Sequence, residues 1–308
     1  MRNPKVVLDN LTKMATNKDY LFKRLYRNLY NAEFYYQAYQ KIYSKEGNMT
    51  PGTDNKTIDG ISIERIEKLI TEIKDFSYQP KPARRIYIPK KNGTKRPLGI
   101  PSTDDKLVQE IIRTLLESIY EPKFSECSHG FRPNKSCHTA LVQCKKRFIG
   151  VRWFIEGDIK GFFDNIDHHI LINILRKTIK DEAFISLIWK FLKSGYIEGW
   201  SYHNTYSGAP QGGIISPILS NIYLHQLDEY IEEYSNDFNR GTKRKENTEY
   251  RKYKKSEYTF KKRYKDKWTK IPPLEKEELK KKFKEIRKLK YTVPFSDPMD
   301  INFRRISM

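Results

Sequence analysis

An acidic residue near the middle of the chain has the setting of a metal ligand. Asp158 lies at the end of residues 152–159, a run whose alternating side chains predict a β-strand. A carboxylate at the end of a buried strand is unfavourable unless a cation neutralises it, and Mg²⁺ prefers oxygen ligands. The backbone carbonyl of Ile159 offers a second oxygen, and the ring of Phe163 follows one turn later, bulky enough to exclude a ribose 2′-OH. Alone, the stretch fits equally well an aspartate that merely ends a strand beside a core phenylalanine.

A glycine-rich loop offers a second set of groups. Residues 207–217 read Ser-Gly-Ala-Pro-Gln-Gly-Gly-Ile-Ile-Ser-Pro, and their glycines permit close approach of the backbone to a base or phosphate. The helix that begins near Pro217 favours an anion at its N-terminus. Gln211 can hydrogen-bond a nucleotide or a template. Taken alone, the loop is equally an ordinary glycine-rich connection.

A basic hairpin is the third candidate. Residues 84–101 contain a β-rich run, a turn at Asn92-Gly93 and a returning run, which together predict two antiparallel strands. The hairpin carries the cations Arg84, Arg85, Lys90, Lys91, Lys95 and Arg96. Cations at such a tip can hold a triphosphate, although charges also protect an ordinary edge hairpin from aggregation.

The charge of the chain is concentrated in one segment. The 308 residues contain 59 Lys and Arg against 38 Asp and Glu, a net charge of +21. Residues 240–290 contribute 22 basic and 8 acidic side chains, interrupted by tyrosine, phenylalanine and tryptophan rings. Cations interleaved with rings suit RNA, because phosphates need neutralising and unpaired bases stack. The alternative is a solvated, partly disordered insertion.

Composition excludes several other classes of protein. No apolar run approaches the roughly 18 residues of a membrane span, so we expect no membrane association. Residues 1–20 lack the apolar segment of a secretory signal, and three cysteines are too few for a disulfide framework. We therefore expect a cytoplasmic protein, with an organellar location left open.

The elements that would position these groups are of mixed type, which indicates an α+β fold. A helix capped by Thr103 is expected to end before Pro122. Other helices are predicted at residues 19–47, 63–73, 136–148, 168–178, 181–193, 217–234 and 274–290, and a second hairpin at 196–206.

The order of the motifs adds information that each lacks alone. The basic hairpin is followed by His129-Gly130-Phe131-Arg132-Pro133, then by the Asp158 stretch, then by Ala-Pro-Gln-Gly-Gly before a Ser-Pro helix. This series resembles the reverse transcriptase domain of group II intron-encoded proteins over about residues 20–235. The resemblance implies a right-hand polymerase fold, with an N-terminal extension and fingers at 1–150, a partial palm at 151–235 and a basic insertion at 236–308.

The resemblance also implies roles for individual residues. Asp158, with the carbonyl of Ile159, would be the first ligand for two Mg²⁺ ions, and Phe163 the gate against the 2′-OH. Gln211 would contact the incoming nucleotide or the template. The triphosphate would be held by Lys90, Lys95 and Arg96.

One part of the family pattern is missing. A Tyr-Ala-Asp-Asp turn should follow the insertion and supply the second metal-binding aspartate, but the one adjacent pair, Asp104-Asp105, opens an apolar-faced helix. Two carboxylates are needed to hold two Mg²⁺ ions about 3.5–4 Å apart. We therefore expect a fragment, without thumb or later domains, that does not itself extend primers, from a parent that polymerises DNA.

Binding to intron RNA needs no metal pair and would assist splicing and mobility. The residues expected to contact RNA are Lys23, Arg24, Arg27, Lys243, Arg244, Lys245, Lys261, Lys262 and Arg263. The parent would also bind an RNA template, a DNA primer and dNTPs, and pairing of two copies is left open. The alternative is a non-catalytic RNA-binding splicing cofactor with a polymerase-like fold. A viral-type RNA-copying polymerase is disfavoured by Phe163.

Overall fold

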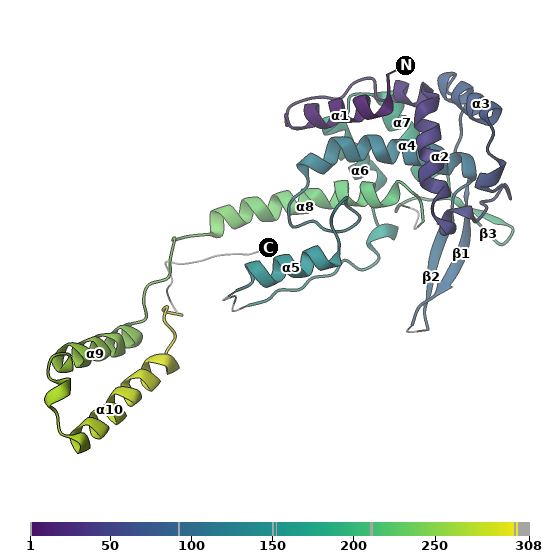
Figure 1. Ribbon diagram of the computed structural model, residues 1–308. Coiled ribbons are helices and arrows are strands. Elements are labelled where there is room, and N and C mark those ends of the chain that lie inside the picture. Colours follow the sequence, from purple (N-terminus) through teal and green to yellow (C-terminus); the bar gives the residue numbers. More distant parts are fainter. Residues whose placement is uncertain are drawn as a thin grey trace. The chain divides into compact units, whose positions relative to one another are not determined.

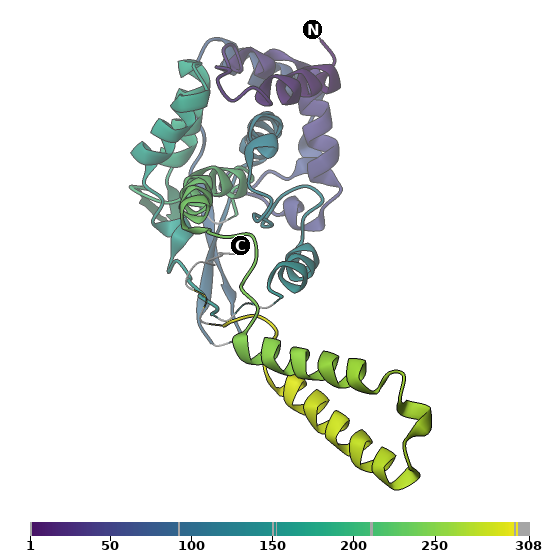
Figure 2. The same cartoon turned by 90° about the vertical axis from the view of Figure 1, so that its left-hand side faces the viewer.

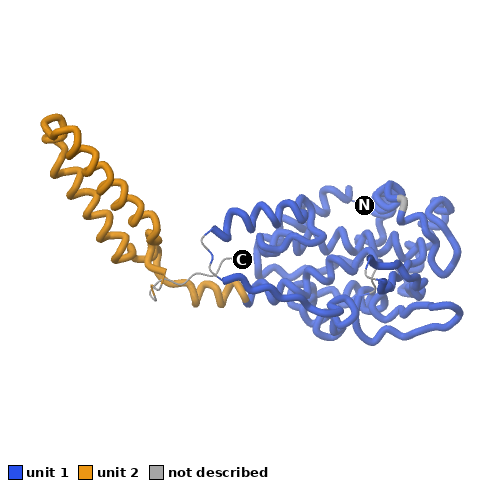
Figure 3. Tube along the Cα trace, turned by 90° about the horizontal axis from the view of Figure 1, so that it is seen from below, with its two compact units in different colours: residues 1–230 blue, residues 231–308 orange. Residues whose placement is uncertain are grey.

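The computed structural model describes residues 2–298 and 300, apart from 92, 150, 152, 210 and 211. The chain divides into two compact units, residues 1–230 and 231–308 (Figure 3), and the division falls within helix α8 (Ser216–Phe238). The expected boundaries at residues 150 and 235 separate functional parts of a polymerase rather than compact units, and they stay predictions.

Unit 1 is mainly helical, with α4 (Thr103–Tyr120) at its centre. Leu107, Ile112 and Leu115 on this helix are completely buried, and α1 and α2 pack against it (Figures 1 and 2). The apolar positions of α4 recur at three- and four-residue spacings, which is why one helix can be covered on several sides. The other helices of this unit are α1 (Pro4–Ala15), α2 (Ala32–Tyr43), α3 (Ile63–Lys74), α5 (Cys137–Arg147), α6 (His168–Thr178) and α7 (Glu182–Lys193).

The described strands form one four-stranded sheet in the order β2-β1-β3-β4. The expected basic hairpin is β1 (Ala83–Pro89) with β2 (Lys95–Ile100), paired antiparallel. The second hairpin is β3 (Tyr196–Glu198) with β4 (Ser201–His203). β3 lies parallel to β1, so two hairpins far apart in sequence share one surface (Figure 1).

Two local expectations are wrong for identifiable reasons. The long helix expected at 19–47 is confined to α2, because Phe22 instead pairs with residue 179: its N–H donates to the Thr178 carbonyl at 2.9 Å. Arg24 then turns the chain with a φ of 60°. At α4 the cap is Ser102 rather than Thr103, since the Ser102 hydroxyl accepts from the Asp105 N–H at 3.2 Å.

The strand expected at 152–159 is also wrong. Residues 153–159 take no regular structure, and Trp153 and Ile155 are 86% and 93% exposed. A strand is stable only when its backbone groups pair with a neighbour, and no described strand pairs with this segment. Asp158 therefore lies in an exposed segment and not at the end of a buried strand.

Unit 2 is a helical hairpin of α9 (Thr248–Tyr264) and α10 (Pro273–Thr292). The basic segment is thus largely helical. Short contacts close its open end, where the Asn247 N–H donates to the Phe295 carbonyl at 2.9 Å and the Asp297 N–H to the Lys245 carbonyl at 2.8 Å. None of the helices in the described part of the chain is both long and apolar enough to cross a membrane.

Candidate nucleotide site

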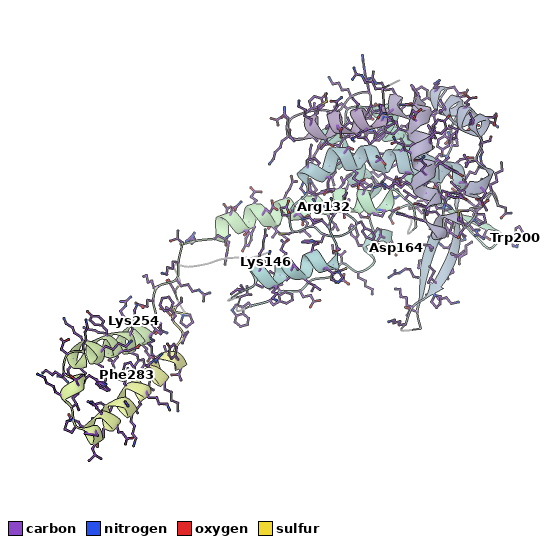
Figure 4. The ribbon with its side chains drawn as sticks, viewed as in Figure 1. Arg132, Lys146, Asp164, Trp200, Lys254 and Phe283 are labelled. Carbon is purple, nitrogen blue, oxygen red and sulfur yellow. The ribbon has the colours of Figure 1, made fainter. Side chains whose placement is uncertain are left out.

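A cavity of about 360 Å³ in unit 1 is lined by three of the motifs. Arg85 and Gly99 come from the β1–β2 hairpin, Phe163 and Asp164 from the turn after Asp158, and residues 204–209 from the loop before Gln211. Figure 4 labels Asp164 beside this region and Trp200 at the exposed end of the β3–β4 hairpin. Segments that are separate in sequence therefore converge on one space.

Backbone hydrogen bonds join the turn after Asp158 to the glycine-rich loop. The Ala209 N–H donates to the Phe163 carbonyl and the Gly208 N–H to the Ile166 carbonyl, both at 2.8 Å. Gly208 has a φ of 87°, and a Cβ atom there would lie 2.6 Å from the Phe163 carbonyl oxygen. Only glycine fits this contact, so the loop sequence fixes the position of the Phe163 backbone.

A buried histidine supports the same junction. The Nε2 atom of His168 lies 2.7 Å from the Gly208 carbonyl oxygen, and its ring contacts Trp189. Burial lowers the pKa of His168, which keeps the ring neutral, so Nε2 must carry the proton that it donates to the Gly208 carbonyl. His168 thereby positions the loop rather than facing the cavity.

The sheet contributes a cation from β1 and an aromatic ring from β3. Arg85, Gly99 and Tyr196 lie on one face of the sheet, because side chains alternate along each strand and the register pairs Arg85 with Gly99. The Arg85 guanidinium carbon lies 3.4 Å from the centre of the Tyr196 ring. Arg85 lines the cavity and forms no ion pair with the described residues, so its positive charge can attract an anion there.

The His129–Pro133 motif has a structural role. The Arg132 guanidinium is buried and donates to both Glu121 carboxylate oxygens and to the carbonyls of Ser125 and Ser128 at 2.6 and 2.8 Å (Figure 4). These bonds fix the loop that follows α4.

The structure brings together only some of the expected site residues. Phe163 lines the cavity, whereas Asp158 is exposed and lines none of the described cavities. Ile159 lines a separate apolar groove against α6 and α8, and Gln211 lies outside the described residues. No group of three His, Cys, Asp or Glu side chains in the described part of the chain could hold a metal ion. The metal assignment of Asp158 and Ile159 stays a prediction.

The expected triphosphate ligands lie elsewhere on the hairpin. Lys90 and Arg96 line a separate cavity of about 520 Å³ near the tip, and Lys95 lines neither. Arg85 was among the hairpin cations named from the sequence but was not assigned to the triphosphate, and Tyr196 was not expected in the site. The alternation along β1 was a usable signal for Arg85, but its pairing with β3 was not visible in the sequence.

Most of the residues expected to contact RNA are exposed. Lys23, Arg24 and Arg27 are exposed in unit 1, as are Lys243, Lys245, Lys262 and Arg263 in unit 2, while Arg244 is half-buried. Lys261 is exposed but forms an ion pair with Glu257 at 3.0 Å. Their roles stay predictions.

Comparisons with known proteins bear on the same residues. A model of the reverse transcriptase (RNA-dependent DNA polymerase) family matches residues 88–250. The chain is 53% identical over 253 residues to group II intron-encoded protein LtrA of Lactococcus lactis subsp. cremoris, which covers 82% of this chain and 42% of that protein. It is 49% identical over 234 residues to an uncharacterized 91 kDa protein in the cob intron of Schizosaccharomyces pombe, with 75% and 29% covered.

Solved structures are also similar to this chain, among them the following. A chain of a partial Cas6-RT-Cas1–Cas2 complex is 21% identical, with a TM-score of 0.46, and the match covers 69% of this chain and 36% of that one. The chain spans less than half the length of each of these three proteins.

Proposed function

This chain belongs to the reverse transcriptase family, and from that premise we propose that it supplies the fingers and part of the palm of an RNA-directed DNA polymerase. The parent would be a group II intron maturase that copies RNA into DNA and assists splicing. The observation that carries the proposal is the convergence of the hairpin, the turn after Asp158 and the glycine-rich loop on one cavity.

The cavity-lining residues suit an incoming dNTP. Arg85 would attract a phosphate group, since it lines the cavity without an ion-pair partner among the described residues and its guanidinium is held against Tyr196. Phe163, fixed by its backbone bond to Ala209, would contact the sugar and disfavour a ribose 2′-OH. Both roles act through binding and orientation rather than through proton transfer.

Reverse transcriptases use divalent metal ions, and for this protein we propose Mg²⁺. Asp158 and the Ile159 carbonyl would supply oxygen ligands, but the described residues do not complete a site, as stated above. Bound metal would stabilise charge on the transferred phosphate. Because the described residues offer no acidic cluster that could hold two metal ions, we propose that this chain alone does not extend a DNA primer on an RNA template. Extension that Asp158→Asn abolishes would contradict this.

Nucleotide binding tests the cavity directly. In equilibrium titrations of a fluorescent dNTP with Mg²⁺, Arg85→Ala should weaken affinity about tenfold, since a charge-assisted hydrogen bond contributes about 1.5–3 kcal/mol. The dNTP affinity of Arg85→Lys should lie between those of the wild type and Arg85→Ala. Phe163→Ala should raise the affinity for the matching ribonucleotide. Lys74→Ala, an exposed change at the end of α3, is the control. Equal effects of Arg85→Ala and Lys74→Ala would exclude this cavity as the nucleotide site.

A second function, binding to intron RNA, is favoured by the basic helical hairpin of unit 2. Such binding would place the protein in a cytoplasmic ribonucleoprotein. It would persist if the polymerase activity were lost, so that the protein would act as a non-catalytic splicing cofactor. Affinity for RNA should fall steeply with salt, because each neutralised phosphate releases counterions. A dissociation constant that hardly changes between low and moderate salt would contradict it.

A further inference from the structure

The cations of unit 2 lie on two different sides of the seam between α9 and α10. The seam contains the Phe260 and Phe283 rings, 5.4 Å apart, and the buried Leu279. Figure 4 labels Phe283 on α10. On one side Glu257 forms ion pairs with Lys261 of α9 at 3.0 Å and with Lys290 of α10 at 2.6 Å. The single charge of Glu257 therefore compensates part of the positive charge on this side of the seam.

The other side of the seam is a groove of about 530 Å³. Its cations are Lys252, Lys255 and Arg263 of α9 and Lys282 of α10, and no acidic side chain lines it. None of these four cations takes part in an ion pair among the described residues, although Glu278 lies one turn before Lys282. The groove thus carries four uncompensated positive charges.

We propose that this groove holds the phosphate backbone of RNA. The inference rests on the proposed RNA binding and assigns it to one side of the hairpin. Residues 252, 255 and 263 share one stripe of α9 and span about 16 Å along the helix axis, which matches a ligand that repeats its negative charge.

The chemistry of the groove favours RNA over other anionic partners. A membrane-binding helix exposes an apolar face beside its cations, but here the apolar residues Phe260, Leu279 and Phe283 pack within the seam. A protein interface is usually anchored by large apolar side chains in a desolvated pocket. In this groove the exposed lining residues are the cations, Ser256 and Thr259, whereas the apolar and aromatic lining residues are half-buried or buried. Repeated cations without an apolar anchor are typical of backbone recognition in nucleic acids.

The groove contains a different set of RNA-contacting cations from the set expected from the sequence. Arg263 lines the groove, whereas its neighbour Lys261, expected to contact RNA on charge alone, is bound to Glu257 on the other side. Lys252, Lys255 and Lys282 were not singled out by the sequence. The helical spacing separates groove cations from paired ones, which a count of charges cannot do.

A matched pair of triple variants tests the groove. The first replaces Lys252, Lys255 and Lys282 by Gln, and the control replaces Lys281, Lys284 and Lys288, exposed lysines of α10 that do not line the groove. A fluorescein-labelled RNA stem-loop is titrated with the full chain at several salt concentrations. The groove variant should lower the slope of log affinity against log salt by about two to three, and the control should change it by less than about one.

Each outcome decides between the proposals. If both triple variants reduce the slope equally, RNA binding stands and the groove assignment fails. If the unaltered chain binds the stem-loop without salt dependence, the RNA-binding function itself fails. A variant with Lys252, Lys255 and Lys282 replaced by Arg keeps the charge and should bind as the unaltered chain does, whereas loss of binding there would overturn the proposal. Groove substitutions that weaken binding to phosphatidylserine vesicles but not to RNA would overturn it too.

Discussion

Two buried carboxylates, Asp105 in unit 1 and Glu257 in unit 2, have opposite surroundings. Asp105 in unit 1 is 2% exposed and accepts hydrogen bonds from neutral groups, namely the Tyr78 hydroxyl, the Ser102 hydroxyl and the Lys81 N–H. Glu257 in unit 2 is 8% exposed and faces Lys261 and Lys290. The same functional group is held by hydrogen bonds in one unit and by cations in the other.

These surroundings shift the pKa values of Asp105 and Glu257 in opposite directions. Burial raises the pKa of Asp105 to about 6, although its hydrogen bonds oppose the shift. The hydrogen bond from Lys290 holds the pKa of Glu257 below its ordinary value, with a further contribution from Lys261. The surroundings of Asp105 therefore tolerate a protonated acid, whereas those of Glu257, like those of the buried Glu110 beside Arg113 in unit 1, favour an ionised one.

The largest expected effect is the pH dependence of unit 1. Since the folded pKa of Asp105 lies above its ordinary 3.8, the folded state binds the proton more tightly, and this stabilisation is lost as pH rises through about 6. Two pKa units correspond to about 3 kcal/mol. Urea unfolding of wild type and Asp105→Asn should therefore give free energies of unfolding whose difference changes by about 3 kcal/mol between about pH 4 and pH 7. Asp9→Asn, at an exposed position of α1, is the control; a pH-independent difference for Asp105→Asn would refute the comparison.

Local patterns predicted much of the fold because the forces that decide it are local. The helix at 168–178 was predicted with its final bounds, since Asp167 caps it and Leu171 and Leu175 recur on its buried face. Both hairpins were placed from their turns and alternating runs. The motif order also indicated that Phe163 belongs to a site with the glycine-rich loop, which the bond from Ala209 supports geometrically.

The rest depended on partners distant in sequence. The expected helix at 19–47 failed because Phe22 pairs with Ile179, and the strand at 152–159 failed because nothing described pairs with it. The sequence could not show which hairpin cation lies beside Phe163, because the position of Arg85 next to Tyr196 depends on the pairing of β1 with β3. The number of charges in the segment likewise could not show that Glu257 pairs with Lys290, 33 residues away.

A smaller effect is expected for the acid of unit 2. Glu257→Gln removes an ion pair that joins α9 to α10 and should destabilise this unit by at most about 1 kcal/mol, because its partners are partly solvated. The depressed pKa means that this stabilisation is present above the ordinary value of 4.5 and is lost as pH falls through the lower folded value. Hydrogen exchange of the α9 amides should be faster in Glu257→Gln at neutral pH and equal to wild type at low pH. Glu285→Gln, on an exposed position of α10, should leave exchange unchanged; if it has the same effect, the cross-helix pair is not the cause.

The smallest effect is expected for Glu246, an acid of unit 2 with exposed cation partners that can be compared with the buried Glu257. Glu246 pairs with Arg251 at 3.2 Å and Lys254 at 2.8 Å, but these cations are 63% and 57% exposed and both lie on the same helix. Because solvent screens exposed pairs and Glu246 joins no second helix, Glu246→Gln should accelerate α9 exchange by less than half as much as Glu257→Gln. Molar salt should erase the Glu246 effect while leaving most of the Glu257 effect, since burial limits screening. Equal salt sensitivity of both variants would mean that Glu257 is no better shielded than a surface acid, and the contrast between the two units would then reduce to Asp105 alone.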